Sequence, residues 1–331
     1  MPKITINERG AILINNSLSI DGHGSSSLRI VTHAHSDHVR DLSKSLTQCR
    51  GVAATALTLD LLTELGHTLS RGNTIRLDYG SKIRVDGLEV MLERTRHIPG
   101  SSQVVAVDED GLRIVYTSDF KKPGRETPII ESDILIIDAV YGNPSYVREF
   151  DDYIESILAD LTVQLLSKGP VIIQGYHGKL QEVMHILRNY GIDAPYLLTP
   201  KTYKLTKAVE KYGLSIGNYF VLNSREGMEL MRSNWFLLLD HLNSNYSYSL
   251  KELKASRIVL SGWEFKKPYR YLGGGRWLVA FSDHADFNGL MNYVINSNPK
   301  TVIVNSVRST YADVFANEVR RITGRECIVM P

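Results

Sequence analysis

The chain has 331 residues, of which 43% are hydrophobic and 22% charged, which is typical of a globular protein with two domains or one large one. Its formal net charge of +2 excludes a polyanion-binding role that depends on overall charge, so any nucleic acid would be held by a local basic surface. The two cysteines, Cys49 and Cys327, form neither a CxxC pattern nor a disulfide framework. We expect a reduced, cytoplasmic setting, because the sequence shows no signal-peptide pattern and no uninterrupted apolar run of about 18 residues.

Six short apolar runs predict buried strands, and each run stops at a residue able to bind a metal or transfer a proton. Such endings suggest a sheet whose strand ends converge on one site. In chain order the runs are 28–32 before His33 and His35, 87–96 before His97, 111–118 before Asp119, 133–137 before Asp138, 276–283 before His284, and 300–304 before Asn305.

Between about 145 and 256 these endings disappear, and strands alternate with helices. Residues 149–168 have helical spacing with acidic residues early, as the helix dipole favours. Residues 169–176 predict a buried strand and 178–191 a second helix, and this βαβ pattern indicates a separate parallel sheet. The expected domains are therefore 1–144 together with 257–331, and the inserted segment 145–256.

Two features late in the chain are expected to be structural. The glycine-rich stretch 272–277 lies between two strand-like runs, so it predicts a hairpin turn and lacks the strand-to-helix context of a phosphate loop. Trp263 lies near the return to the first domain and is expected to pack.

The segment VTHAHSDHVRD, residues 31–41, gathers three histidines and one aspartate within six positions. Buried imidazole and carboxylate groups lose hydration unless something replaces it, and a metal ion does so. Side chains alternate in an extended segment, so His33 and His35 point to the same side and chelate one ion. Asp37 and His38 then face a neighbouring position, at the start of a predicted helix that begins at Asp37.

One short segment therefore supplies ligands to two adjacent metals. Nitrogen ligands with a few carboxylates and no thiolate fit zinc best, with manganese or iron as alternatives. His97 and Asp119 follow this motif in an order that supports a shared site.

These motifs resemble those of the metallo-β-lactamase fold hydrolases and, within them, the β-CASP nucleases. Asp21 in LSID looks like the family's first motif, HAHSDH like its second, RHIPGS like its third and YTSDF like its fourth. LIIDAVYGNP is similar to the acidic motif, FSDHADF resembles the segment with an extra histidine, and GYHGKLQE looks like the first helix start of the inserted domain. LSGW and FSDHADFNGL look closest to small prokaryotic ligase-associated or messenger-RNA-processing-like exonucleases. The resemblance implies an α/β fold, the αββα sandwich, with an inserted β-CASP-like α/β domain.

The resemblance also implies a role for each candidate residue. Asp138 and His284 would be hydrogen-bonded to each other, which orients the imidazole and raises its pKa as a general acid requires. Asp37 would orient the attacking water in addition to binding metal. The implied metal ligands are His33, His35 and His97 for the first metal, Asp37 and His38 for the second, and Asp119 as the bridge.

This set predicts a metal-dependent nuclease that hydrolyses phosphodiester bonds of single-stranded DNA or RNA. Two cations about 3.5–4 Å apart would activate a water and hold a phosphate oxygen, and His284 would protonate the departing alkoxide. Lys179 opens a predicted helix, where its ammonium and nearby backbone N–H groups are expected to grip a second phosphate. No membrane partner is expected, and the sequence does not define the oligomeric state.

Two residues depart from the family pattern. Asn305 stands where RNA-cleaving members usually have a histidine that completes the second metal site, and an amide oxygen is a weaker zinc donor. We therefore expect one tight Zn²⁺ and a weaker or absent second metal, with Mn²⁺ as a substitute. Some DNA-directed relatives also lack that histidine, which slightly favours DNA. Asp138 stands where a glutamate is usual and shortens the reach by one methylene.

Two other functions stay open. The first is a weakly active or inactive paralogue that binds nucleic acid in a processing complex, although the complete metal set argues against it. The second is a hydrolase of small esters or thioesters, although an inserted domain of this size suits a polymer. Zinc content with a phosphodiesterase assay distinguishes an active nuclease from the inactive paralogue. Trials of thioesters against oligonucleotides distinguish the nuclease from a hydrolase of small esters.

Overall fold

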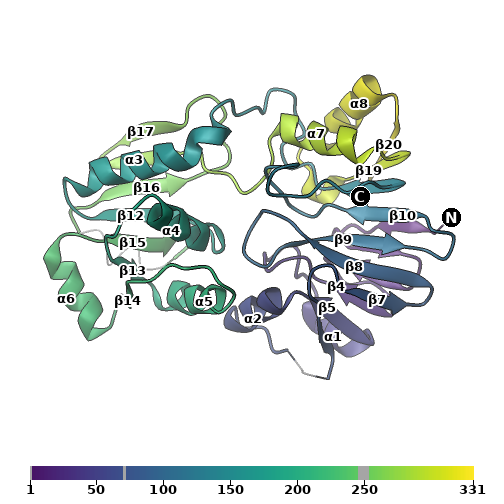
Figure 1. Ribbon diagram of the computed structural model, residues 1–331, viewed down its shortest axis with the longest axis horizontal. Coiled ribbons are helices and arrows are strands. Elements are labelled where there is room, and N and C mark those ends of the chain that lie inside the picture. The colour runs from purple at the N-terminus through teal and green to yellow at the C-terminus, as the bar shows by residue number, and fades with distance from the viewer. Residues whose placement is uncertain (1, 70–71, 245–252) are drawn as a thin grey trace. The chain divides into compact units, whose positions relative to one another are not determined.

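The computed structural model describes residues 2–69, 72–244 and 253–331. The chain divides into two compact units (Figure 1). The first unit consists of Met1–Val147 and Asp283–Pro331, and the second of Arg148–Ser282. Within the described ranges, none of the helices combines the length and the apolar character needed to cross a membrane.

Two β-sheets pack face to face in the first unit. Their facing side chains share one inner core, to which Ile12 and Ile30 contribute from one sheet and Val90 and Ile136 from the other. The first sheet has the strand order β1 (Ile4–Ile6), β2 (Ile12–Ile14), β3 (Leu18–Ile20), β4 (Leu28–Ile30), β5 (Gly51–Ala54) and β6 (Thr74–Arg76). The second has the order β20 (Glu326–Met330), β19 (Thr301–Asn305), β11 (Ile134–Ile137), β10 (Arg113–Tyr116), β9 (Ser102–Val107), β8 (Leu88–Arg94) and β7 (Lys82–Val85).

Helices cover this pair of sheets. On the second sheet, α8 (Ala312–Thr323) packs against β19 and β20, with α7 (Phe287–Ser297) beside it. On the first sheet, α1 (Leu42–Gln48) packs against β5, and α2 (Ala56–Glu64) follows that strand. The layers therefore form the αββα sandwich that the sequence motifs imply.

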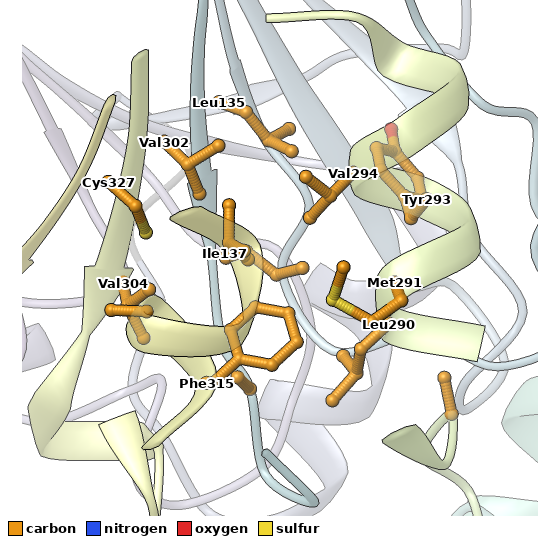
Figure 2. Packing of buried hydrophobic residues seen from close by; sticks show 14 of the residues in the cluster. Leu135, Ile137, Leu290, Met291, Tyr293, Val294, Val302, Val304, Phe315 and Cys327 are labelled. Carbon is orange, nitrogen blue, oxygen red and sulfur yellow. The ribbon is translucent and has the colours of Figure 1, made fainter. Parts of the chain in front are cut away.

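Strand alternation explains why the second sheet is apolar on both faces. In β11, Leu135 and Ile137 belong to an outer core beneath the helices, whereas Ile136 belongs to the inner core. Successive side chains of a strand point to opposite faces, so a sheet covered on both sides needs a continuous apolar run. Phe315 from α8 and Leu290 from α7 complete the outer core (Figure 2).

Among its described residues, the second unit has one sheet, in which every strand pair is parallel except the pair of β17 and β18. This agrees with the parallel sheet predicted for the middle of the chain. The strand order is β14 (Tyr219–Val221), β13 (Tyr196–Leu198), β15 (Leu237–His241), β12 (Val171–Gly175), β16 (Ser256–Leu260), β18 (Arg276–Val279) and β17 (Tyr269–Gly273). The helices in the described part of this unit are η1 (Asp151–Tyr153), α3 (Ile154–Leu166), α4 (Lys179–Asn189), α5 (Pro200–Glu210) and α6 (Arg225–Ser233).

The six predicted strands are present, but they do not form one sheet. They correspond to β4, β8, β10, β11, β18 and β19, which are divided among three sheets. The predicted helix start at Asp37 is also wrong, because the helix begins at Leu42. Asp41 directly before it has a left-handed backbone with φ of 54°, which a continuous helix does not allow.

The boundary at which the chain returns to the first unit differs from the predicted domain boundary. Residues 257–282 were expected in the first domain, but they belong to the second unit. The reason is strand pairing, since β16 is hydrogen-bonded to β12 and β18 is hydrogen-bonded to β16. No apolar pattern in the sequence marks which sheet a strand joins.

The glycine-rich stretch is a hairpin turn, as predicted. Gly274 and Gly275 connect β17 to β18 with φ angles of 58° and 73°, which glycine adopts without steric cost. Trp263, by contrast, is 55% exposed, so the prediction that it packs is wrong.

Replacing Phe315 by alanine is expected to lower the free energy of unfolding by about 3–5 kcal/mol, because it removes a fully buried ring and leaves a cavity under α8. Val314 on the same helix is 37% exposed, and Val314→Ala serves as the matched control, with an expected change within about 0.5 kcal/mol. Urea unfolding followed by circular dichroism measures both. Equal losses in the two variants would contradict the packing described for α8.

Candidate metal centre

Four strands of the first unit end at candidate site residues. His33 follows β4, His97 follows β8, Asp119 follows β10, and Asp138 comes directly after β11. All four are buried. The sandwich therefore brings together residues that are far apart in the sequence.

The first donor set consists of His33, His35, His97 and Asp119, whose potential ligand atoms all lie within 4.8 Å of one another. The Nε2 of His97 lies 3.0 Å from the Nδ1 of His35. The Oδ2 of Asp119 lies 3.6 Å from the Nε2 of His33 and 3.5 Å from the Nε2 of His97. These are the three histidines predicted for the first metal, together with the predicted bridging carboxylate.

Hydrogen bonds orient these imidazoles. The Nδ1 of His97 lies 3.0 Å from the carbonyl oxygen of Asp283, and because a carbonyl only accepts, Nδ1 carries the proton and Nε2 presents its lone pair to the cluster. The Nδ1 of His33 lies 3.0 Å from the hydroxyl of Thr32. The buried Nε2 of His33 has no hydrogen-bond partner among the described residues. An imidazole nitrogen that is buried and unpartnered inside a ring of donors fits a metal ligand.

A second donor set consists of His38, Asp119 and Asp138, whose ligand atoms also lie within 4.8 Å of one another. The Nε2 of His38 lies 3.3 Å from the Oδ2 of Asp119 and 3.2 Å from the Oδ2 of Asp37. Asp119 is thus common to both sets, and Asp37 lies at the edge of the second.

Asp21 supports the second set. Its Oδ1 accepts a hydrogen bond from the backbone N–H of Thr32 at 2.8 Å, and its Oδ2 lies 2.7 Å from the Nδ1 of His38. The Thr32 hydroxyl donates to the same Oδ2. Because both oxygens of Asp21 are engaged, this carboxylate orients His38 and directs its Nε2 toward the cluster.

Burial keeps the first set of histidines neutral. Desolvation lowers the pKa of His33 well below its usual value, lowers that of His35, and lowers the pKa of His97 to about 3. A metal binds only the neutral imidazole. The cluster therefore presents three nitrogen lone pairs at neutral pH.

The charged members of the centre behave differently. Burial alone would raise the pKa of Asp119, but His284 and His38 beside it lower that pKa well below its usual value, so the carboxylate is ionised. Burial opposes charge on His38 as well, yet the neighbouring carboxylates of Asp37 and Asp21 raise the pKa of its imidazole well above the usual value. The second set thus places an ionised carboxylate beside an imidazole whose charged form is favoured in the absence of metal.

The predicted hydrogen bond between Asp138 and His284 is wrong. The Nε2 of His284 lies 3.3 Å from the Oδ2 of Asp119. Asp138 instead accepts a hydrogen bond from the Tyr116 hydroxyl through Oδ2, and its buried Oδ1 has no hydrogen-bond partner in the described part of the chain. Burial raises the pKa of Asp138 to about 6. Asp138 does not pair with His284 because its carboxylate belongs to the second donor set, with His38 and Asp119.

Asn305 ends β19 and is fully buried. Its Oδ1 accepts a hydrogen bond from the backbone N–H of Val307 at 3.2 Å and so caps the short helix η3 (Ser306–Arg308). The amide oxygen is therefore already engaged by the backbone, and its role as a weak ligand of the second metal stays a prediction.

Lys179 lies in the second unit, where it is the first residue of α4. Its side chain is buried, and Nζ donates a hydrogen bond to the carbonyl of Phe281 at 3.2 Å. The side chain of Gln181 accepts the backbone N–H of Gly178 at 2.7 Å and fixes this helix start. The role of Lys179 in substrate binding stays a prediction.

Arg308 is a residue of the centre that sequence reasoning missed. Its guanidinium donates hydrogen bonds to the carbonyls of Gly10 and Asp21, each at 2.6 Å, and to the carbonyl of Asp37 at 3.1 Å. Its Nε also lies 3.7 Å from the carboxylate of Asp37. A single arginine after a strand carries no motif, so the sequence held no signal for this role.

The donors of both sets fit a divalent metal. They are imidazole nitrogens and carboxylate oxygens, and neither Cys49 nor Cys327 belongs to them. Neutral imidazoles suit zinc and several other divalent ions, whereas a carboxylate-rich set also suits manganese.

Comparisons with known proteins identify relatives of the chain. No protein-family model matches the chain. The chain is 41% identical over 138 residues to an "Uncharacterized protein in lig 3'region" of Acidianus ambivalens, in an alignment that covers 42% of this chain and 99% of that protein. It is 27% identical over 314 residues to a probable DNA ligase of Opitutus terrae, covering 91% of this chain and 28% of the ligase. It is 23% identical over 263 residues to ribonuclease TTHA0252 of Thermus thermophilus, covering 70% of this chain and 60% of the ribonuclease.

A solved structure supports the fold. The crystal structure of a protein of unknown function from Enterococcus faecalis V583 matches with a TM-score of 0.61 at 14% identity, over 93% of this chain and 81% of that one. The αββα layers with a histidine and aspartate cluster at the strand ends define the metallo-β-lactamase fold. Within that class, the chain belongs to the β-CASP nuclease family, as its motifs predicted. It spans less than two thirds of the length of both the ligase and the ribonuclease that it matches.

Metal content after mild chelation is expected to be about one ion per chain, because three neutral imidazoles hold the first metal and the second set has one histidine. His33→Ala should lose this ion. His185 lies outside both donor sets, so His185→Ala should retain it. Elemental analysis of the purified variants measures the content, and two chelation-resistant metals in the wild type would show that the second site is closed as firmly as the first.

Proposed function

We propose that this protein is a zinc-dependent nuclease that hydrolyses phosphodiester bonds in single-stranded DNA or RNA. The observation that carries the proposal is the shared carboxylate of Asp119, which belongs to two adjacent donor sets. Two adjacent divalent ions are a recurrent arrangement for phosphodiester hydrolysis. The family relationship supports the same chemistry.

The first donor set is proposed to hold the tightly bound Zn²⁺, through His33, His35 and His97 with Asp119. The second set would hold a weaker ion, Zn²⁺ or Mn²⁺, because its donors are mainly carboxylates. When bound, the ions lower the pKa of a coordinated water and neutralise charge that develops on the phosphate. The ligands proposed for this second ion are His38, Asp138 and the shared Asp119, joined by Asp37 at the edge of the set and by a weak or absent contribution from Asn305.

Asp37 is proposed to orient the attacking water. Its side chain is 45% exposed, which lets it reach a solvent molecule, whereas Asp119 is nearly inaccessible. Burial opposes its charge, but His38 lowers the pKa of the Asp37 carboxyl, so it is an ionised hydrogen-bond acceptor. Arg308 anchors the same residue through its backbone carbonyl.

His284 is proposed to donate the proton to the leaving alkoxide. Its side chain is 26% exposed, and its Nε2 lies 3.3 Å from the Oδ2 of Asp119. The ring lies in an edge contact with Tyr141 at a centroid distance of 6.0 Å and beside His97 at 4.9 Å. These contacts fix the direction in which the proton is delivered. Asp119 therefore takes the orienting role that the sequence analysis gave to Asp138.

Lys179 is proposed to bind a second phosphate of the strand. It stands at the N-terminus of α4, where backbone N–H groups and the helix dipole favour an anion. Its Nζ, which donates a hydrogen bond to the carbonyl of Phe281, adds a positive charge at this helix start.

The choice between DNA and RNA has support on both sides. The match to a probable DNA ligase favours DNA, and the match to a ribonuclease favours RNA. Asn305 in place of the usual histidine favours DNA. We therefore propose single-stranded DNA as the first substrate, in a cytoplasmic setting that the two free cysteines support.

An inactive or weakly active nucleic-acid-binding paralogue is the second candidate, and Asn305 is the residue that favours it. End-labelled single-stranded DNA and RNA with different 5′ ends, incubated with metal-supplemented protein, separate the two functions. Cleavage products from the DNA or from the RNA support the nuclease function. The ladder of product lengths shows the direction in which the enzyme degrades the strand. Binding without any product would support the paralogue.

His284→Ala is expected to reduce cleavage of an oligonucleotide roughly 10²- to 10⁴-fold while metal content stays unchanged, because it removes the proton donor and no ligand. The p-nitrophenyl ester of thymidine 5′-phosphate should rescue this variant, since nitrophenolate departs without a proton. His33→Ala is the control that should lose metal and show no rescue. A His284→Ala variant that loses metal, or that cleaves both substrates equally poorly, would show that His284 is not the general acid.

A further inference from the structure

The hairpin Tyr269–Val279, formed by β17 and β18, lies at the edge of the sheet in the second unit (Figure 1). It presents a row of aromatic rings. Tyr269 and Tyr271 are 40% and 57% exposed. Tyr271 pairs directly with Trp277, and the centroids of these two rings are 4.9 Å apart. The Tyr269 ring lies 5.8 Å from the same indole, so the three rings are continuous on one face of the hairpin.

The outermost ring of this row is held in place. The hydroxyl of Tyr271 accepts a hydrogen bond from the backbone N–H of Gly275 at 3.1 Å, which fastens the side chain over the turn. The turn itself depends on the positive φ angles of Gly274 and Gly275. A ring that is already ordered loses little side-chain entropy when a ligand stacks on it.

Positive charge surrounds these rings. Glu264 is the only acidic residue between 257 and 282, and it forms an ion pair with Arg270 at 2.6 Å. The side chains of Lys266, Lys267 and Arg276 are exposed. The cations of this segment are Arg257, Lys266, Lys267, Arg270 and Arg276. Because the whole chain carries a net charge of only +2, this is a local concentration of positive charge.

A basic cavity adjoins the turn of the same hairpin. It has a volume of about 450 Å³, and its lining includes Lys168, Lys254, Arg257 and the backbone of Gly274. Among the described residues that line it, none is acidic. Three cations around one cavity fit a phosphate group.

We propose that this aromatic hairpin is a stacking surface for single-stranded nucleic acid, with the adjoining cavity as a site for a backbone phosphate. The proposal rests on the nuclease function and adds a binding surface in the second unit. Exposed rings with cations beside them bind single strands of any sequence, because every base has a face that stacks on an aromatic ring. Base pairing hides those faces, so the surface selects single strands over duplex.

A second copy of the chain is the other partner that could bind an exposed edge strand. Arg270 in β17 places a charge on this edge, and charged side chains on an edge strand oppose pairing between sheets. The nucleic acid is therefore the better-matched partner.

The test measures binding of a fluorescein-labelled 20-nucleotide oligo-dT to the full chain by anisotropy, with chelator present so that no cleavage occurs. Tyr269→Ala with Tyr271→Ala should weaken binding about tenfold or more, since each stacked base contributes substantially. Tyr271→Phe keeps the ring and should bind within about twofold of wild type. Tyr153→Ala with Tyr190→Ala is the matched control, because both tyrosines are exposed in the same unit at 67% and 50%.

The cavity is tested by the salt dependence of the same binding. Lys168→Ala with Lys254→Ala should reduce the slope of log affinity against log salt by about 1.4, since each phosphate contact on a single strand contributes about 0.7. Lys204→Ala with Lys211→Ala, two exposed lysines of the same unit, should leave the slope unchanged.

Unchanged affinity in the double tyrosine variant would overturn the stacking surface, as would equal affinity of the wild type for duplex and single strand. Loss of self-association in that variant with unchanged DNA binding would assign the hairpin to a contact between copies. Hydrolysis of the p-nitrophenyl ester by the wild type, measured in parallel, tests the nuclease function separately. Protein that binds oligo-dT through the hairpin but hydrolyses no ester would retain this inference and refute the proposed function.

Discussion

A carboxylate that is ionised and almost fully buried, that of Asp119, is the constraint on which the arrangement of the first unit depends. Its side chain is 7% exposed, and its Oδ2 lies 3.3–3.6 Å from the imidazoles of His33, His38, His97 and His284. A buried charge is costly unless opposite charge or hydrogen bonds compensate it. The imidazoles that provide opposite charge are those of His38 and His284, which come from two separate segments. The fold of the first unit therefore has to bring these two segments to the strand end that carries Asp119.

A second layer of polar contacts holds the loops that the strands do not reach. Asp21 binds the backbone of Thr32 and the ring of His38, and so fixes both ends of the segment that carries the second motif, HAHSDH. Arg308 donates to the carbonyl of Asp37 and to the carbonyl of Asp21, which ties that segment to the C-terminal part of the chain. Buried charges in such positions are destabilising when unpaired, which gives each partner a structural as well as a chemical role.

The sequence predicts those parts of the molecule that depend on local spacing. The alternation of His33 and His35 after a strand needs only neighbouring residues. The αββα layering, by contrast, was expected only from the resemblance of the motifs to a known family. Arg308 could not be found in this way, because its bond to Gly10 joins positions 298 apart in the chain. For the same reason 257–282 was expected in the first domain, since the apolar pattern of a strand does not say which sheet it joins. The expected hydrogen bond between His284 and Asp138 was wrong, because the direction in which a side chain points at the end of a strand depends on how it packs.

The central claim is that Asp119 is shared by two metal sites, and anomalous diffraction tests it most directly. Crystals grown with zinc, measured on both sides of the zinc absorption edge, should show two anomalous peaks about 3.5–4 Å apart with the Asp119 carboxylate between them. The peak beside His33, His35 and His97 should be the stronger of the two. A single peak at full occupancy with the Asp119 carboxylate turned away from it, after growth in excess zinc, would contradict the account.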